Sequence, residues 1–430
     1  MESPVNLVPQ EISESVTIQD VQEPRSRSLS KGVLLVLLFL AALNCATNFD
    51  TVRNFDGQQD FSIFYTGGRI IWSGHAAQLY DLATQAYYQT PHYQIRPLPF
   101  DHPAYELLMF LPLIPLPFNM AAVACGIIGL ALSWLIAQIL ARQLPYFPRP
   151  APLWIFAMCA ATFPLLWTLA QGQDSIVLLA LFAFVYLNLK SRRDVVAGAA
   201  LAAGLFKFTL ILPFVIPFLL FRRWKFLAGF AAGGFVVTSI SVAMTGIEGA
   251  RQYVRLLLEL IAHPGLGYIH TQGMPNLRGF LTDVLLDNGL SHAAFSIVLG
   301  VCTLLLLLVP LLTFRDGEER SERFDLWFGL NLTVATLASP HVLWHDLTIL
   351  LLPVLLATNF LLKPAERGIS WKAIVWAVAY ALALPEYFVF YPGYYFPIWC
   401  VLAYWFLRKI MTFDHVELNA KAAPAELQAT

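Results

Sequence analysis

Hydrophobic residues occur in long runs over most of the chain, and short polar segments separate them. Runs of roughly twenty apolar residues have the length of a helix that crosses the hydrocarbon core of a bilayer. The pattern therefore predicts an all-α polytopic membrane protein, a helical bundle with about 10 to 12 transmembrane or re-entrant helices. The predicted regular helices cover residues 32–47, 119–141, 153–170, 174–189, 226–245, 292–314, 324–338, 342–362, 371–388 and 394–407.

Two further apolar segments do not fit a simple crossing. Residues 104–117 are rich in proline and would rise only about 21 Å as a helix, which is less than the hydrocarbon thickness. Residues 195–220 carry Lys207 near their middle. Both segments are predicted to be re-entrant or broken helices, which a bilayer tolerates where protein or water covers the freed backbone. In an alternative topology, residues 104–117 cross the membrane completely, which would place Lys190, Arg192 and Arg193 on the outer side.

The composition supports a membrane protein. The 430 residues are 58% hydrophobic and only 13% charged, about half the charged share of soluble domains, which excludes a soluble globular enzyme. Lys and Arg number 27 against 28 Asp and Glu, so the net charge of -1 provides no field for nucleic acid. The five cysteines are scattered in or beside apolar runs and are interpreted as core thiols.

The basic residues predict an orientation. The domain is expected at 32–410, between a disordered cytoplasmic tail at 1–31 and a cytoplasmic C-terminal tail at 411–430. A cleaved signal peptide is the less favoured alternative for the N-terminus, because Leu43-Asn44-Cys45-Ala46 lacks a small-x-small cleavage site. In the re-entrant topology, 20 of the 27 Lys and Arg residues fall in the cytoplasmic segments, and the two long loops, 50–103 and 246–291, face outside.

With this topology, unusual polar residues from several segments reach the outer face. An ionisable side chain at membrane depth is costly unless it is paired or lines a wet cavity, so their convergence predicts an outward-facing cavity. Simpler interpretations are that Lys207 snorkels to the interface and that His341 or His345 caps a helix. The residues in question are Asp50, Asp56, Asp60, Arg69, His75, Asp101, His102, Gln171, Gln173, Asp174, Lys207, His263, His270, Gln272, Arg278, His341, His345 and Asp346.

Asp60 stands at the start of an aromatic, amphipathic stretch about a dozen residues after the first apolar run. The stretch predicts a helix on the membrane surface with a carboxylate at its N-terminus. Such a carboxylate stays ionised beside the helix dipole, as a general base requires. It could equally serve only as an N-cap, and the sequence leaves both roles open.

Several other chemistries are not indicated. The chain has no P-loop, GxGxxG, HExxH or GxSxG motif, so no cofactor is expected. No DxD-like carboxylate pair stands out in the outer loops, so no metal is expected either. The main alternative function is a transporter or flippase of a lipid-linked sugar, which would also need broken helices and an outward cavity. It leaves the long outer loop with Asp60 unexplained, and no internal repeat is apparent.

A series of short motifs stands in order between about residues 33 and 360: Asp60-Phe61, Tyr65, Gly74, Leu79-Tyr80-Asp81, His102-Pro103-Ala104, Leu111-Pro112-Leu113-Ile114-Pro115-Leu116-Pro117, Gly172-Gln173, Ala197-Gly198, Lys207-Phe208-Thr209, Arg222-Arg223-Trp224, Ser339-Pro340-His341, Trp344-His345 and Pro353. In this order they resemble glycosyltransferase family 87 of the GT-C superfamily, the polyprenol-phosphate-dependent membrane glycosyltransferases. Two departures, His102-Pro103-Ala104 for Tyr-Pro-Pro and Lys207-Phe208 for Lys-Pro, bear on substrate identity more than on reaction class.

The resemblance implies a multi-pass protein of the bacterial cytoplasmic membrane with its site on the outer face. Such an enzyme transfers a hexose, by family default mannose, with inversion, from a polyprenyl-phosphate donor to a glycolipid or glycan acceptor. Asp60 would be the general base. The implied ligands of the donor phosphate are Lys207, His341, His345 and Arg278, and those of the sugar or acceptor are Gln173, Gln272, Arg69 and His102. Membrane lipids are the other expected partners, and nucleic acid is not.

Overall fold

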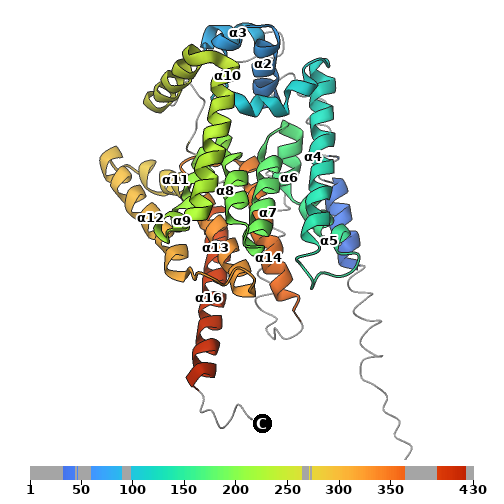
Figure 1. Cartoon of the computed structure of the whole chain (residues 1–430), viewed down its shortest axis with the longest axis vertical. Helices are drawn as coiled ribbons and strands as arrows, with labels where there is room; N and C mark the ends of the chain where they lie inside the picture. Colours follow the sequence, from blue (N-terminus) through green and yellow to red (C-terminus); the bar gives the residue numbers. More distant parts are fainter. Residues whose placement is uncertain are drawn as a thin grey trace, which may run out of the picture.

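The computed structural model describes residues 32–43, 46, 60–89, 98–263, 271, 274–363 and 395–422, with side chains up to residue 414. All regular secondary structure in these residues is helical, as the apolar runs predict. The molecule is elongated, with a bundle of steep helices beneath a small layer of short ones (Figure 1).

Five described helices are long and apolar enough to cross a membrane, or up to seven if two bent pairs each count as one span. The five are Phe118–Leu140 (α4), Trp224–Ala262 (α10), His292–Thr313 (α12), Trp344–Leu361 (the 3₁₀ helix η7, Trp344–Leu350, followed by α14, Leu351–Leu361) and Phe396–Asp414 within α16 (Tyr395–Ala422). The shorter helices α7 (Ser175–Lys190) and α13 (Glu322–Ala338) complete the bundle. The predicted crossing at 371–388 lies outside the described residues.

One predicted helix is in fact broken. Residues 153–170 were expected to form one crossing, but the structure has α5 (Ala151–Ala160) and α6 (Phe163–Gln171), which meet at 72°. The cause is Pro164 in the first turn of α6, since proline disfavours a helical conformation in the residue before it and lacks the N–H that a continuous helix would use. The break delivers the end of α6 to the site described below.

The break expected at Lys207 is present. Helix α8 (Asp194–Ala202) and the pair η4 (Leu205–Lys207) and α9 (Phe208–Leu220) meet at 63°. The two ends of this hairpin come together, because Arg223 Nη2 lies 2.8 Å from Asp194 Oδ2. The segment therefore enters and returns on the same side, with Lys207 at its tip.

Helix α10 packs against α8 with direct backbone contact. A Cβ atom on Gly198 would lie 2.0 Å from the carbonyl oxygen of Phe226, and one on Gly229 would lie 2.0 Å from that of Val195. Only glycine fits at both positions, as in other close helix pairs of membrane proteins. Helix α10 then kinks at Gly246, where φ is +74°, and stays helical to Ala262, so the start of the expected outer loop 246–291 is helical.

A layer of short helices covers one end of the bundle. It consists of α2 (Phe61–Trp72), η1 (Ala76–Gln78), α3 (Leu82–Gln89), η2 (Ala104–Met109) and η3 (Leu111–Leu113). Thus 104–113 form two short 3₁₀ helices and no crossing. The layer has its own apolar core, which includes the stacked rings of Phe64 and Phe110.

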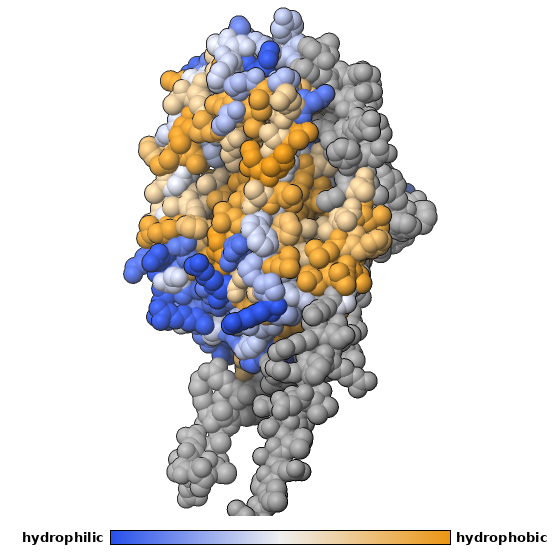
Figure 2. Space-filling view, turned by 90° about the vertical axis from the view of Figure 1, so that its right-hand side faces the viewer, coloured by the Kyte–Doolittle hydropathy of each residue, from blue (hydrophilic) through white to orange (hydrophobic). Residues whose placement is uncertain are grey.

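The surface shows the arrangement expected of a membrane protein. On the face that Figure 2 shows, a wide apolar band crosses the middle of the molecule above a strongly hydrophilic zone. Helix α12 also exposes apolar side chains that would be costly to place in water, such as Ile297, Leu304 and Leu312. Helices α11 (Leu277–Leu281) and the π-helix η6 (Thr282–Leu286) join the bundle beside α12, and a further apolar helix, Gly32–Leu43, lies within the first predicted run, 32–47.

Candidate active site

Asp60 lies against the turn that joins α6 to α7. Its backbone N–H donates to Gln171 Oε1 at 3.0 Å, and Gln173 Nε2 donates to its Oδ2 at 2.8 Å. The turn is tight because Gly172 has φ +63°, and a Cβ there would lie 2.7 Å from the Cβ of Phe61. The side chain of Asp60 remains 26% exposed, so the carboxylate is oriented and still reachable.

The structure separates the two roles that the sequence left open for Asp60. Asp60 precedes α2 but its side chain makes no capping hydrogen bond. Asp81, which precedes α3 in the same layer, does cap, because its Oδ2 accepts from the N–H of Thr84 at 2.8 Å and from the Thr84 hydroxyl at 2.6 Å. One aspartate therefore serves its helix, and the other leaves its carboxylate available to a ligand.

Lys207 is buried with two carboxylates. Its Nζ lies 2.8 Å from Asp174 Oδ1, donates to Ser175 Oγ at 3.0 Å, and donates to Asp346 Oδ1. Two of the three N–H donors of the ammonium group are thus used in hydrogen bonds, and Asp174 is its second ion-pair partner. Lys207 is buried among these groups and is not a snorkelling residue, so a phosphate would compete with them for its charge.

His345 connects Asp60 to the Lys207 group. Its Nδ1 lies 3.9 Å from Asp60 Oδ2, and its Nε2 lies 3.5 Å from Asp346 Oδ1. Asp346 is held in place, since its Oδ2 accepts from the backbone N–H of Leu343 at 2.9 Å. A continuous series of polar side chains thus runs from the partly exposed Asp60 to the buried Lys207.

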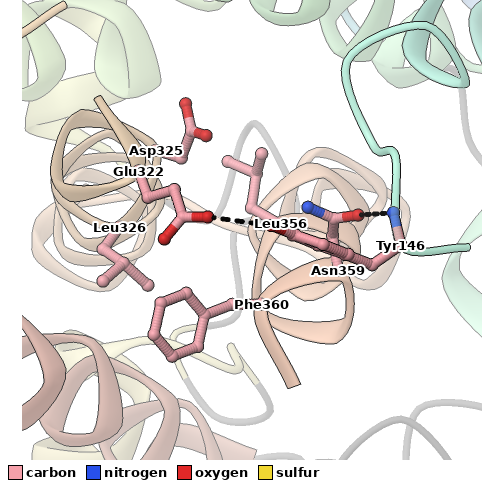
Figure 3. A pocket seen from close by; sticks show the side chains of 7 residues that line it. All are labelled: Tyr146, Glu322, Asp325, Leu326, Leu356, Asn359 and Phe360. Atoms are coloured by element: carbon pink, nitrogen blue, oxygen red, sulfur yellow. Dashed lines mark hydrogen bonds between the residues drawn. The ribbon is translucent and has the colours of Figure 1, made fainter. Parts of the chain in front are cut away.

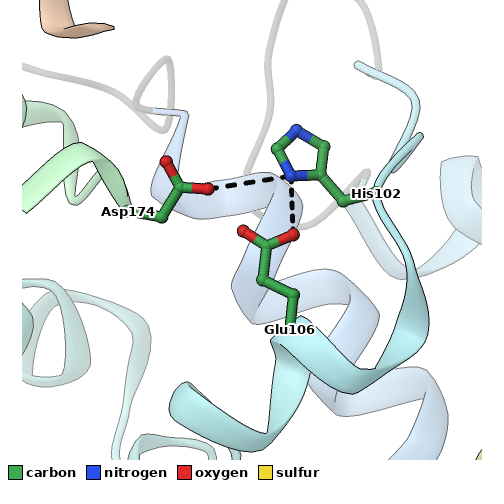
Figure 4. Close-up of side chains that lie close together, drawn as sticks. All are labelled: His102, Glu106 and Asp174. Atoms are coloured by element: carbon green, nitrogen blue, oxygen red, sulfur yellow. Dashed lines mark hydrogen bonds and ion pairs between the residues drawn. The ribbon is translucent and has the colours of Figure 1, made fainter. Parts of the chain in front are cut away.

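A second group lies on the other side of Asp174. His102 Nδ1 is 2.6 Å from Glu106 Oε2 and 3.7 Å from Asp174 Oδ2, and all three side chains point toward one another (Figure 4). Burial disfavours the charged imidazole, but the carboxylates of Glu106, Asp101 and Asp174 raise the pKa of His102 to about 10. Burial also raises the pKa of Glu106 well above its usual range, and Asp174 acts in the same direction.

Arg278 and His341 lie together where α11 meets the segment after α13. Arg278 Nη1 donates to the carbonyl oxygen of Pro340 at 3.3 Å, and Asn276 Nδ2 donates to that of Ser339 at 2.8 Å. His341 Nδ1 is buried and has no hydrogen-bond partner among the described residues. Burial lowers the pKa of His341, so its imidazole is neutral near pH 7.

The structure brings most of the predicted residues together. Asp60, Gln173, His345 and Lys207 form one connected group, with His102 beside it. Arg69 does not join them, because it is exposed nine residues further along α2, about 13.5 Å of helix rise from Asp60. Gln272 lies outside the described residues.

Sequence reasoning missed the carboxylate of Glu106 and gave Asp174 and Asp346 no role. Glu106 is fully buried in the apolar segment after Pro103. The signal that singled out Lys207, an ionisable residue within an apolar stretch, also applied to Glu106. Asp174 and Asp346 each stand directly next to a predicted site residue, Gln173 and His345.

A small pocket lies elsewhere, between α13, α14 and the chain before α5 (Figure 3). Its polar groups are already partnered. Glu322 accepts from the Tyr146 hydroxyl at 3.3 Å and from Lys363 at 2.8 Å, and Asn359 Oδ1 accepts from the Tyr146 N–H at 3.0 Å. We therefore assign no chemistry to this pocket.

The arrangement around Asp60 suits transfer to a hydroxyl group. It offers a partly exposed carboxylate that can accept a proton, held by an amide and flanked by a histidine. Arginine and histidine donors at Arg278 and His341 are of the kind that binds phosphate.

Comparison with known proteins supports this chemistry. The model of glycosyltransferase family 87 matches residues 100–340. The polyprenol-phosphate-mannose-dependent alpha-(1-2)-phosphatidylinositol pentamannoside mannosyltransferase of Mycolicibacterium smegmatis is 30% identical to this chain over 299 residues, which are 68% of each protein. No solved structure matches the chain. Asp60 lies before the residues matched by the family model, so its assignment rests on the geometry and on its sequence motif.

Proposed function

This chain belongs to glycosyltransferase family 87 and is a hexosyltransferase of the membrane, and from this premise we propose that it transfers mannose from a polyprenyl-phosphate donor to a glycolipid or glycan acceptor. The name of the Mycolicibacterium smegmatis relative supports this donor and a glycolipid as the acceptor. The proposed site faces outward from a bacterial cytoplasmic membrane, as the distribution of basic residues favours.

The observation that carries the proposal is the free carboxylate of Asp60. Gln173 orients it, no backbone N–H of α2 caps it, and it is 26% exposed. In the proposed reaction, Asp60 takes the proton of the acceptor hydroxyl as its oxygen attacks the anomeric carbon. The bond from that carbon to the phosphate oxygen breaks on the opposite side, so the configuration inverts. Polyprenyl phosphate leaves as an anion and needs no proton from the enzyme.

The leaving phosphate requires positive charge or N–H donors. Arg278 fits this role best, because only one of its donors has a described partner, the Pro340 carbonyl oxygen. His341 and His345 are the further candidates, and Lys207 acts on them through Asp346 while it keeps its present partners. Gln173 remains a candidate for a sugar hydroxyl once its bond to Asp60 rearranges, and His102 is a candidate beside it.

The test is product formation by the purified protein in lipid nanodiscs, with polyprenyl-phosphate-mannose and a mycobacterial-type glycolipid acceptor. We expect a mannosylated lipid with inverted anomeric configuration, and a 10²- to 10⁴-fold lower turnover in Asp60→Asn with unchanged thermal stability. A transporter or flippase would move the donor unchanged, so wild-type protein that forms no product but relocates the lipid would refute the proposal.

Asp81→Asn is the matched control. It removes a carboxylate from the same layer and at the same position relative to a helix, but one whose Oδ2 is engaged in capping. It should cost about 1 kcal/mol of stability or less and leave turnover intact. Equal activity in Asp60→Asn and Asp81→Asn would exclude Asp60 as the base.

A further inference from the structure

His102, Glu106 and Asp174 form a group whose composition and spacing suit a metal ion. The three residues come from two segments, and one possible ligand atom from each lies within 4.8 Å of the others. Glu106 and Asp174 are 0% and 1% exposed, whereas His102 is partly accessible. A buried carboxylate is costly without a cation or a set of hydrogen bonds, so two of them side by side require a shared partner.

The hydrogen bonds of the group are incomplete. Glu106 Oε2 is bonded to His102, but Glu106 Oε1 has no hydrogen-bond donor among the described residues and is directed toward Asp174 (Figure 4). Asp174 Oδ2 likewise has no hydrogen-bond donor there, while Asp174 Oδ1 is close to Lys207. Two fully buried carboxylate oxygens thus face the same small space.

The surroundings of the group resemble a second coordination shell. The other nitrogen of His102, Nε2, lies 3.6 Å from Asp101 Oδ1, and metal-bound imidazoles usually donate their second N–H to a carboxylate. Lys207 holds the outer oxygen of Asp174 at 2.8 Å. The His102 backbone is also fixed, because its carbonyl oxygen accepts from the Tyr80 hydroxyl at 3.0 Å.

The net charge of the whole site points the same way. Five acidic side chains, those of Asp60, Asp101, Glu106, Asp174 and Asp346, share two cations, Lys207 and the His102 imidazole, whose pKa its acidic neighbours raise. Such a site repels a phosphate unless a further cation is present. One histidine and two carboxylates are ligands that suit a divalent ion with mixed nitrogen and oxygen preference.

We propose that His102 Nδ1, Glu106 and Asp174 bind one divalent metal ion of the Mn²⁺ or Zn²⁺ class beside the Asp60 carboxylate. Ligands of one such ion, each about 2.1 Å from it, lie about 3 to 4 Å apart, and the 3.7 Å between His102 Nδ1 and Asp174 Oδ2 already meets this. His102 Nδ1 and Glu106 Oε2 are 2.6 Å apart, so this distance must lengthen by a few tenths of an ångström when the metal ion binds. Metal binding also releases the imidazole proton to the solvent, which removes the hydrogen bond that holds the two atoms close. The expectation of no metal rested on the absence of a short DxD-like pair, and residues 102, 106 and 174 are too far apart in sequence to form one.

The alternative occupant of this space is a proton shared by the three side chains, and the experiment is designed to tell the two apart. The full chain in nanodiscs is stripped with a chelator, desalted and titrated with Mn²⁺ alone, and free Mn²⁺ is followed by electron paramagnetic resonance. We expect one saturable ion per chain and a rise in melting temperature with Mn²⁺ concentration. In Glu106→Gln, which keeps the size of the side chain, the affinity should fall at least tenfold.

Glu248→Gln is the matched control, because Glu248 is an exposed carboxylate on α10 whose partners are surface arginines. The Glu248→Gln protein should bind Mn²⁺ with the same affinity as the wild type. A nitrogen coupling in the pulsed spectrum of bound Mn²⁺, lost in His102→Gln, would identify the imidazole ligand. Absence of saturable binding by the wild type, or unchanged affinity in Glu106→Gln, would overturn the site. The titration needs neither donor nor acceptor, so its result is independent of the transfer assay.

Discussion

The two ends of this molecule organise their charges in opposite ways. At the end beneath α2, five acidic side chains share Lys207 and the His102 imidazole, and oxygens of Glu106 and Asp174 lack hydrogen-bond donors among the described residues. At the other end, near the start of α13, acidic groups have cationic partners. The second region, here called the paired end, comprises the pairs Lys190–Asp325, Arg223–Asp194, Arg223–Glu319, Arg315–Asp414, Arg323–Asp414 and Lys363–Glu322.

We infer from this difference that the ion pairs at the paired end stabilise the fold, whereas the acidic groups beneath α2 serve to bind a ligand. The paired end joins helices that are distant in sequence, as where Arg223 ties α8 to the loop before α13. Each carboxylate there has a cationic partner, although Asp194 Oδ1 and Glu319 Oε2 also lack a hydrogen-bond donor among the described residues. The other end keeps a surplus of negative charge and open hydrogen-bonding positions, and such incomplete networks persist where a ligand completes them.

The largest effect is expected from Lys207→Met. It removes the one lysine from the acid-rich end and leaves Asp174 and Asp346 buried without it, which should cost about 3 to 5 kcal/mol. Thermal unfolding in detergent measures this loss, and the added substitution Asp346→Asn should restore part of it. Lys225→Met, at an exposed lysine, is the control with no expected change. Wild-type stability in Lys207→Met would show that the two carboxylates do not depend on the lysine.

A smaller effect of a different kind is expected from Arg223→Met at the paired end. Stability should fall by about 2 kcal/mol, because Asp194 and Glu319 lose charged hydrogen bonds, while Arg192 Nε still lies 3.5 Å from Glu319. Turnover per folded molecule should not change, because none of the residues assigned to the site is among its partners. A selective loss of turnover with normal stability would contradict the division between the two ends.

The smallest effect concerns acid conditions. Burial alone would raise the pKa of Glu319, but its hydrogen bonds with the backbone and with Arg223 outweigh burial and lower it. A lowered pKa in the folded state means that Glu319 stabilises the protein above its unfolded pKa of about 4.3 and that this contribution disappears as the pH falls through the lower folded value. Melting temperatures measured between pH 3 and 6 should therefore decline less steeply in Glu319→Gln than in the wild type. Parallel curves would show that another carboxylate controls acid stability.

The fold could be predicted from the sequence wherever a single physical signal dominates. Apolar runs located α4, α12 and α13 to within two residues, and the charge of Lys207 predicted the break in 195–220. The bend at 161–162 was missed, because the apolar character continues through Pro164 and hydropathy alone does not register a proline in a first turn.

The sequence indicated which residues belong to the candidate site better than it indicated which of them are in contact. Motifs and membrane depth singled out Asp60, Gln173 and His345, which the structure brings together. The partners of Lys207 were beyond sequence reasoning, because Asp174 and Asp346 are 172 positions apart and meet only after α7 packs against η7. For the same reason, the sequence did not show that Lys207, which it predicted to be a phosphate ligand, also pairs with two carboxylates of the protein.

The glycine contact between α8 and α10 has a mechanical consequence. Gly198 and Gly229 let the two backbones touch, and α8 leads directly to the hairpin tip that carries Lys207. A methyl group at either glycine would wedge the helices apart and tilt that tip away from α7. The position of the charge that balances Asp174 and Asp346 is therefore set in part by two residues that have no side chain.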